Sequence, residues 1–158
     1  MGRIHNLKVH EKELYSSSGI DTIVIEGDYW DRHFVVLRHH SGHPNVYVEV
    51  LPDDWLYRQE PSEFGKEHGY DDRYEQFTGY VHGGATYYGG AYWNSQDQKT
   101  YIGWDYSHLG DYDPRDTLSG IEDEGYRWSI AEILMDVAHA VDGFEIDNLT
   151  WAESEHEQ

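Results

Sequence analysis

The chain has 158 residues, which is long enough for one domain with a sizeable hydrophobic core. An aromatic content of 15% and 16 glycines exclude a disordered chain and indicate a folded protein rich in tight turns. The 31 acidic residues outnumber the 11 Lys and Arg residues and give a formal net charge of −20, which disfavours direct binding to nucleic acid or to anionic lipid surfaces.

Two interpretations of this acidity stay open. Adaptation to a high-salt cytoplasm would keep a carboxylate-rich surface hydrated, with salt screening the repulsion between its charges. Mimicry of nucleic acid would instead make the protein an acidic decoy that binds a basic protein surface. The acidic residues are spread along the whole chain rather than concentrated in regular arrays, which favours the halophilic interpretation.

The chain has no cysteine, which excludes disulfides, thiolate metal ligands and a cysteine nucleophile. No apolar run approaches the roughly 20 residues that a membrane-spanning helix requires, and the N-terminus lacks the apolar core of a signal peptide. We therefore expect a soluble cytoplasmic protein without membrane contact, located in the host cytoplasm if a virus encodes it. A homo-oligomer stays open.

Three β-rich segments follow a polar lead-in of residues 1–18, which alternatively forms a loosely attached first strand. The segments are residues 21–30, 33–40 and 45–52. In the third segment, valines alternate so that they share one face of a strand. An antiparallel meander is the simplest way to connect the three.

Residues 53–76 interrupt the β pattern with a long charged excursion that contains at most a short helix. Such excursions are often functional loops or lids, but a solvated insertion explains the composition equally well. The β character resumes in residues 77–93 and 99–106, and a polar turn between them allows these two segments to pair.

An amphipathic helix is predicted for residues 130–142. Ser129 and Glu132 form a capping box at its start, and Gly143 stands where a C-cap glycine belongs. The apolar positions that share one helical face are Ile130, Ile133, Leu134, Val137, Ala138 and Val141.

The sequence thus predicts one α+β domain over residues 19–145. It should contain an antiparallel sheet of about five or six strands with the C-terminal amphipathic helix packed on one face. Residues 146–158 should form a frayed acidic tail.

One candidate site begins at His82, which precedes the paired glycines Gly83 and Gly84 and a return to β pattern at Thr86. Paired glycines expose backbone N–H groups or allow a close approach by another group, and a histidine there can act as base, ligand or hydrogen-bond donor. Taken alone, the segment is better explained by a glycine bulge with a structurally hydrogen-bonded histidine.

A second candidate segment follows the strand at residues 99–106. Asp105 lies at the end of this strand, on the opposite face from Trp104, and His108 and Asp111 follow in a turn-rich loop. If this strand pairs with the preceding one, His82 approaches Asp105, and two histidines and two aspartates converge.

These two segments resemble an uncharacterised family of short proteins of tailed phages and mobile elements. Members carry a His-Gly-Gly-Leu-Thr-Tyr segment and then Gly-Phe-Asp-Cys-Ala-His-x-Gly-Asp. The resemblance extends over roughly residues 33–112 and departs at Ala85, Trp104, Tyr106 and Ser107, where Leu, Phe, Cys and Ala are usual. It implies an accessory role but no reaction, and the loss of the family's Cys at Tyr106 makes a thiol mechanism for the group implausible. The matching residues are His43, His82, Gly83, Gly84, Thr86, Gly103, Asp105, His108, Gly110 and Asp111.

Three explanations compete for the Asp/His cluster: a metal or catalytic site, a ligand pocket and a hydrogen-bonded loop. A Mn²⁺, Mg²⁺ or Zn²⁺ site formed by His82, Asp105, His108 and Asp111 would activate water for hydrolysis, although the spacing is not a standard ligand signature. A hydrogen-bonded loop without chemistry is the structural explanation. A Ser-His-Asp triad is disfavoured because the chain has no nucleophile elbow.

A ligand pocket is the remaining explanation. Aromatic residues near the cluster, Trp104 among them, offer planar faces for a base, although core packing explains them too. Phosphates are harder to accommodate, because Lys99 is the sole basic residue between positions 77 and 113.

We therefore expect an accessory protein, with counter-defence as one such role, that binds a small polar, nucleotide-like ligand without turnover. A metal-dependent hydrolase and an acidic decoy are the alternatives, and the sequence assigns no cofactor. The residues expected to contact the ligand are His82, Gly83, Gly84, Thr86, Trp104, Asp105, His108 and Asp111.

Overall fold

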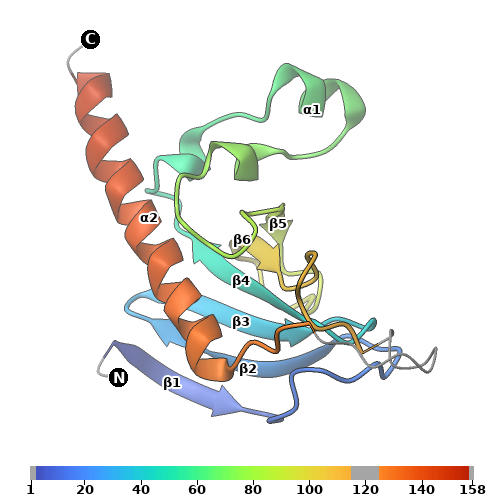
Figure 1. Cartoon of the computed structure of the whole chain (residues 1–158). Coiled ribbons are helices and arrows are strands. Elements are labelled where there is room, and N and C mark those ends of the chain that lie inside the picture. The colour runs from blue at the N-terminus through green and yellow to red at the C-terminus, as the bar shows by residue number, and fades with distance from the viewer. Residues whose placement is uncertain (1–2, 115–124, 157–158) are drawn as a thin grey trace.

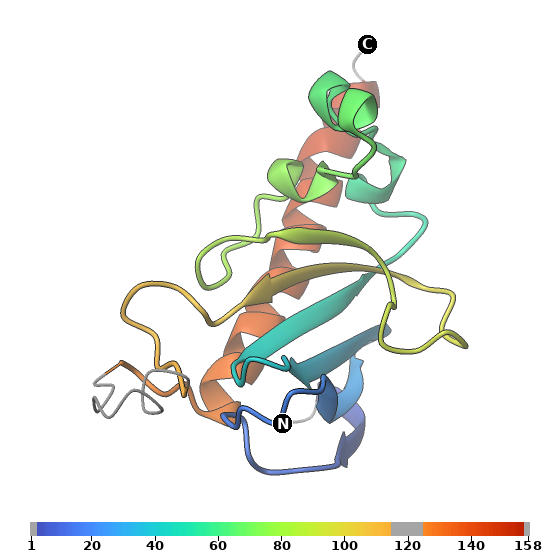
Figure 2. The ribbon, with the colours of Figure 1, turned by 90° about the vertical axis from the view of Figure 1, so that its right-hand side faces the viewer.

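Six antiparallel strands form one sheet in the order β1-β2-β3-β4-β6-β5 in the computed structural model, which describes residues 3–114 and 125–156. The helix α2 crosses one face of this sheet (Figure 1), so that Figure 2 shows it behind the strands. The predicted α+β class, with an antiparallel sheet and one C-terminal helix packed on it, is confirmed. The strands are β1 (Ile4–Val9), β2 (Thr22–Tyr29), β3 (Arg32–Arg38), β4 (Pro44–Val50), β5 (Tyr87–Gly90) and β6 (Thr100–Asp105).

The polar lead-in contributes an edge strand. β1 pairs with β2 over Ile4 to Val9, although all of its side chains after Ile4 are exposed. Its register shifts between His5 and Lys8, and Asn6 there has a φ of 54°, so the strand carries a bulge. Backbone pairing, which hydropathy does not reveal, therefore extends the sheet beyond the boundary at residue 19.

The main core lies between the sheet and α2. Val46, Val48 and Val50 of β4 all belong to it, as their alternation predicts, and Ile102 and Trp104 of β6 join them. A smaller apolar cluster covers the opposite face, where Leu37, Tyr47, Ala91 and Tyr101 pack together. The alternation of side chains along each strand thus supplies two apolar layers, and the larger one binds the helix.

The helix α2 (Ile130–His156) starts where the sequence predicts. The Ser129 N–H donates to Glu132 Oε1 at 3.0 Å, and the Glu132 N–H donates to Ser129 Oγ at 3.2 Å, which is the reciprocal capping box. Although α2 has 27 residues, neither it nor any other described helix is long and apolar enough to cross a lipid bilayer.

The predicted end of this helix is wrong. α2 continues through Gly143 and includes most of the segment expected to form a frayed tail. Gly143 serves a close contact instead of a cap, because a Cβ at this position would lie 2.4 Å from the Gly79 Cα. Beyond it, buried Asp147 accepts a hydrogen bond from the Thr78 hydroxyl, and Asn148 Oδ1 accepts the Trp55 N–H at 2.7 Å. Tertiary contacts therefore extend the helix by several turns.

The excursion at residues 53–76 packs against the second half of α2 (Figure 1). It contains three short helical segments, η1 (Leu56–Arg58), α1 (Glu63–His68) and η2 (Arg73–Gln76). Buried Asp54 anchors the start of the excursion by accepting two hydrogen bonds of 2.6 Å from Arg32 of β3. The expected short helix is present as α1.

Val137→Asp should destabilise the fold by more than about 3 kcal/mol, because Val137 is fully buried and the new carboxylate would have no partner. Met135→Asp adds the same charge to the same helix at a side chain that is 61% exposed, and should change the unfolding free energy by at most about 0.5 kcal/mol. Urea denaturation of both variants measures the difference. Equal losses of stability would contradict the packing of α2 described here.

Gly143→Ala should destabilise the protein, by about 1–3 kcal/mol, because its Cβ would overlap the Gly79 backbone. An ordinary glycine inside a helix gives the opposite sign, since alanine has the higher helix propensity. Thr150→Ala, at an exposed position of the same helix, is the control and should be neutral or slightly stabilising. A gain in melting temperature for Gly143→Ala would show that the close contact is absent.

Candidate functional site

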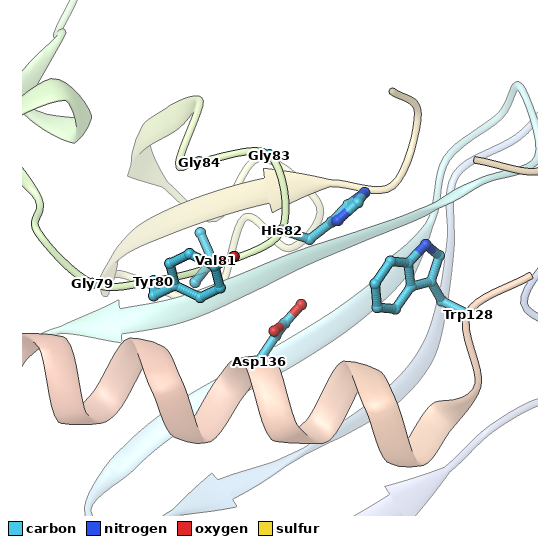
Figure 3. A pocket seen from close by; sticks show the side chains of 8 residues that line it. All are labelled: Gly79, Tyr80, Val81, His82, Gly83, Gly84, Trp128 and Asp136. Atoms are coloured by element: carbon cyan, nitrogen blue, oxygen red, sulfur yellow. The ribbon is translucent and has the colours of Figure 1, made fainter. Parts of the chain in front are cut away.

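A cleft of about 420 Å³ lies between the segment that precedes β5 and the first turns of α2. Figure 3 shows the Asp136 side chain pointing from α2 towards this segment, and the ring of Trp128 standing opposite His82. The cleft therefore forms where two parts of the chain that are about 50 residues apart in sequence meet. Its lining residues are Gly79, Tyr80, Val81, His82, Gly83, Gly84, Trp128 and Asp136.

His82 is held from three sides. Its Nε2 lies 2.8 Å from Asp111 Oδ2, its ring stacks on Tyr106 at 5.0 Å between centroids and 8° between planes, and Trp128 lies 4.5 Å away. An ionised Asp111 can only accept, so Nε2 carries the proton in this bond and the neutral ring keeps a lone pair on Nδ1. The imidazole is thus fixed in orientation and in tautomer.

Asp111 organises this side of the cleft. Its Oδ2 accepts the His108 N–H at 2.9 Å as well as the bond from His82, and its Oδ1 accepts the Trp128 Nε1–H at 2.9 Å. Burial favours the neutral carboxyl, but these hydrogen bonds outweigh burial and hold the pKa of Asp111 below its ordinary value. One carboxylate therefore positions the two aromatic rings, His82 and Trp128, that face the cleft.

Asp136 connects the cleft to the core. Its Oδ2 accepts the Tyr106 hydroxyl at 2.6 Å, and the Tyr106 oxygen accepts the Trp104 Nε1–H at 3.1 Å. Burial and the bond to Asp136 raise the pKa of Tyr106 far above its ordinary value, so the phenol stays protonated and donates. Asp136 therefore lines the cleft as a hydrogen-bond acceptor, and its bond to Tyr106 fixes its position.

The two glycines have different reasons to be glycine. Gly83 has a φ of +69°, and a Cβ on it would lie 2.1 Å from His108 Nε2, so it allows the His108 ring to pack over the backbone. Gly84 has a φ of +80° and open space around its Cα, and its N–H donates to the Val81 carbonyl at 3.0 Å. The pair forms a turn at the edge of the cleft.

The structure brings the four Asp/His residues together but gives them different surroundings. His82 and His108 lie with ring centroids 5.2 Å apart, and His108 Nε2 lies 3.4 Å from Asp105 Oδ1. Asp105 and His108 form an outer pair, and neither lines the cleft. Asp111 supports His82 from behind.

Two predicted ligand contacts have other positions. Trp104 is 1% exposed and belongs to the core, so the expectation that it contacts a ligand is wrong. Thr86 is exposed and follows the turn, outside the cleft lining. Strand alternation already places Trp104 on the same face as Ile102, and this face is the one that α2 covers.

Sequence reasoning missed Tyr80, Trp128 and Asp136. Trp128 directly precedes the capping box, where an aromatic residue is readily interpreted as part of the helix entry. Asp136 lies beside Val137 near the apolar face of α2, and a carboxylate at such a position is a signal of a buried polar contact. Neither signal indicates which distant segment completes the site.

The alternative metal site at His82, Asp105, His108 and Asp111 lacks the required geometry. No three of these side chains bring ligand atoms within 4.8 Å of one another, whereas the three residues Asp21, His39 and His40, alone in the described part of the chain, do so. Both carboxylate oxygens of Asp111 also accept hydrogen bonds from protein groups. Water activation by a metal therefore has no support at this cluster.

Asp111→Asn should destabilise the protein at pH 7, because the amide cannot accept all three hydrogen bonds and loses the charge that strengthens them. The pKa of Asp111 is depressed in the folded state, so its contribution is present above the ordinary aspartate value of about 3.9 and is lost as the pH falls through the lower folded value.

The unfolding free energy of the wild type and of the Asp111→Asn variant should therefore differ by about 1–3 kcal/mol at pH 7 and converge in strong acid. Asp53→Asn, at an exposed position, is the control and should match the wild type at neutral pH. A constant difference across the whole pH range would contradict this account of Asp111.

No family model, curated protein or solved structure matches the chain. What the cleft does has to be inferred from its own residues: an oriented imidazole, an indole, a fixed carboxylate and a glycine turn.

Proposed function

We propose that the cleft binds a small polar, nucleotide-like molecule through its planar ring and holds it without turnover. The observation that carries this proposal is His82, which Asp111, Tyr106 and Trp128 hold in one orientation at the wall of an open cleft. Fixing a polar aromatic side chain beside an accessible cavity pre-organises a binding surface.

The shape of the cleft suits a single ring system. Its volume of about 420 Å³ lies in the range of small-molecule sites, which is roughly 300–1,000 Å³. Trp128 and the 82% exposed Tyr80 offer aromatic faces, and each base stacked on such a ring gains about 1–3 kcal/mol. A purine or pyrimidine fits these surfaces.

The charges of the cleft indicate which part of the molecule enters it. Asp136 offers an acceptor for an exocyclic amine or a ring N–H, while the described residues of the lining include no Lys or Arg. Arg127, next to Trp128, is occupied by the Tyr112 ring, with its Cζ 3.9 Å from the centroid. The nucleoside part should therefore enter the cleft, and any phosphates should remain in solvent.

The same lining favours retention over catalysis. No serine, threonine or cysteine side chain stands among the described residues of the lining, so the His82–Asp111 pair has no aliphatic hydroxyl or thiol to activate there. A protein that keeps a nucleotide-like molecule intact removes it from circulation. Such retention is consistent with the accessory role that the resemblance to phage and mobile-element proteins implies, with counter-defence as one such role.

The test combines native mass spectrometry with calorimetry on a panel of nucleosides, nucleoside monophosphates and nucleoside triphosphates. One nucleoside should bind in a 1:1 complex and be released unchanged when the protein is denatured. Its triphosphate should bind no more tightly, because the net charge of −20 repels it.

Tyr80→Ala and Trp128→Ala should each weaken this binding by about 5- to 150-fold, the equivalent of one lost stacking contact. Tyr70→Ala is the control: it removes a tyrosine ring that is 46% exposed and lies outside the cleft, so it should leave the affinity unchanged. Absence of binding across the panel, or release of a chemically altered ligand, would overturn the proposal. Capture of a basic protein that disappears at high salt and survives Tyr80→Ala would favour the acidic decoy instead.

A further inference from the structure

Asp21, His39 and His40 form a second polar cluster, and none of them lines the cleft. Each offers one ligand atom, and these atoms all lie within 4.8 Å of one another. We propose that the three side chains bind one divalent transition-metal ion, with Zn²⁺ as the representative metal. The proposal concerns a site separate from the cleft and does not depend on the function proposed above.

The sheet itself places these ligands. Asp21 directly precedes β2, and His39 and His40 directly follow β3, while Thr22 and Arg38 are paired in register between them. Neighbouring strands that end side by side fix the distance between the residues that extend them. The cluster therefore does not require a mobile loop to close.

Hydrogen bonds already hold the carboxylate against one imidazole. Asp21 Oδ1 accepts the His40 N–H at 2.7 Å and lies 3.0 Å from His40 Nδ1. A carboxylate oxygen and an imidazole nitrogen bound to one Zn²⁺ at about 2.0–2.2 Å in tetrahedral geometry are separated by roughly 3.4 Å. A small adjustment of the two side chains therefore accommodates an ion between them.

The second imidazole is supported by its neighbours. Ser41 Oγ lies 2.7 Å from His39 Nδ1, which also accepts the Ser41 N–H at 3.2 Å, and the His39 ring stacks on buried His43 with 4.8 Å between centroids and 16° between planes. These contacts fix the orientation of the His39 ring. Binding of an ion through Nε2 requires Nδ1 to carry the proton and donate it to Ser41 Oγ in place of accepting the Ser41 N–H, and an oxygen that accepts from the other ring nitrogen is the usual outer partner of a metal-bound histidine.

The turn that carries these residues has little freedom. Gly42 has a φ of +103°, and a Cβ on it would lie 2.5 Å from the Pro114 Cγ and 2.9 Å from the Ser17 nitrogen. The chain therefore packs tightly around the turn between β3 and β4. Restricted ligands lose less conformational entropy when they bind an ion.

The ligand types select the class of metal. Two imidazoles and one carboxylate suit Zn²⁺ and its neighbours Ni²⁺ and Cu²⁺, whereas Ca²⁺ and Mg²⁺ prefer sets of oxygens. Three protein ligands leave a position for water or for another molecule. The net charge of −20 raises the local concentration of cations around the protein. The competing explanation is that Asp21 and His40 form an ordinary surface ion pair beside stacked rings.

The experiment uses the full chain without a polyhistidine tag, stripped with a chelator and titrated with Zn²⁺ in a calorimeter and by native mass spectrometry. We expect one Zn²⁺ per chain and a higher melting temperature with the ion bound, which a chelator reverses. Asp21→Asn keeps an oxygen for the His40 N–H but removes the charged ligand, and His40→Ala removes an imidazole. Loss of an outer partner typically weakens metal binding by about 10- to 100-fold. Loss of a direct ligand in either variant should weaken it more.

His5→Ala is the matched control, because it removes an exposed histidine outside the cluster and should leave the affinity unchanged. Absence of a 1:1 complex with the wild type would overturn the proposal, as would equal weakening by His5→Ala or unchanged affinity in Asp21→Asn. Circular dichroism verifies that each variant is folded. If His40→Ala fails to fold, Asp21→Asn and the chelator-sensitive melting of the wild type decide the question. Nucleoside binding to the cleft should be the same in all of these variants.

Discussion

A buried ion pair between Arg32 and Asp54 connects the parts of this fold that the sheet alone would leave separate. Each guanidinium NH₂ group donates to one carboxylate oxygen at 2.6 Å, and Asp54 also accepts from Asn148 of α2 at 2.9 Å. The Arg32 Cζ lies 4.4 Å from the centroid of the Phe144 ring, also in α2. Breaking such a pair leaves an uncompensated charge in the interior, which typically costs 3–5 kcal/mol, so the strand, the excursion and the helix are held as one unit.

The cleft is a consequence of where this unit places α2. Gly143 brings the helix into contact with Gly79, and Asp147 binds Thr78, so the chain is fastened to the helix just before it turns away to form the cleft. Asp136, two turns earlier on α2, faces the same segment. The distance between helix and segment is therefore fixed at one end by glycine contact, and the cavity opens as the two diverge.

Local patterns predicted the fold well where the deciding interactions are local. The capping box at Ser129 gave the first turn of α2, and the alternating valines gave β4, because both depend on residues close in sequence. The end of α2 depends on Thr78 and Trp55, more than 60 residues away, so local patterns alone misidentify Gly143 as a cap. Residues 77–86 have the β character of a strand in sequence, but they form turns and irregular chain before β5 begins. Their contacts with α2 do not appear in their own periodicity.

For the candidate site, the sequence indicated the Asp/His cluster but not the cleft beside it. Paired glycines after a histidine and closely spaced aspartates are visible as motifs, and they do meet in space. The wall formed by Trp128 and Asp136 comes from the helix entry, whose side chains look like ordinary helix residues until the sheet is placed against them.

The two edge strands of the sheet affect how readily the protein aggregates at high concentration. An open sheet exposes unpaired N–H and C=O groups at both edges, and another copy of the chain can add to them in the first step of fibril growth. Here one edge is β1, whose bulge at Asn6 interrupts the hydrogen-bonding ladder and whose Lys8 is exposed, and the other is β5, which has only four residues. Each edge thus has a different feature that hinders pairing with a strand of another copy. The acidic surface adds a long-range repulsion that keeps copies apart at low salt but weakens as salt is added.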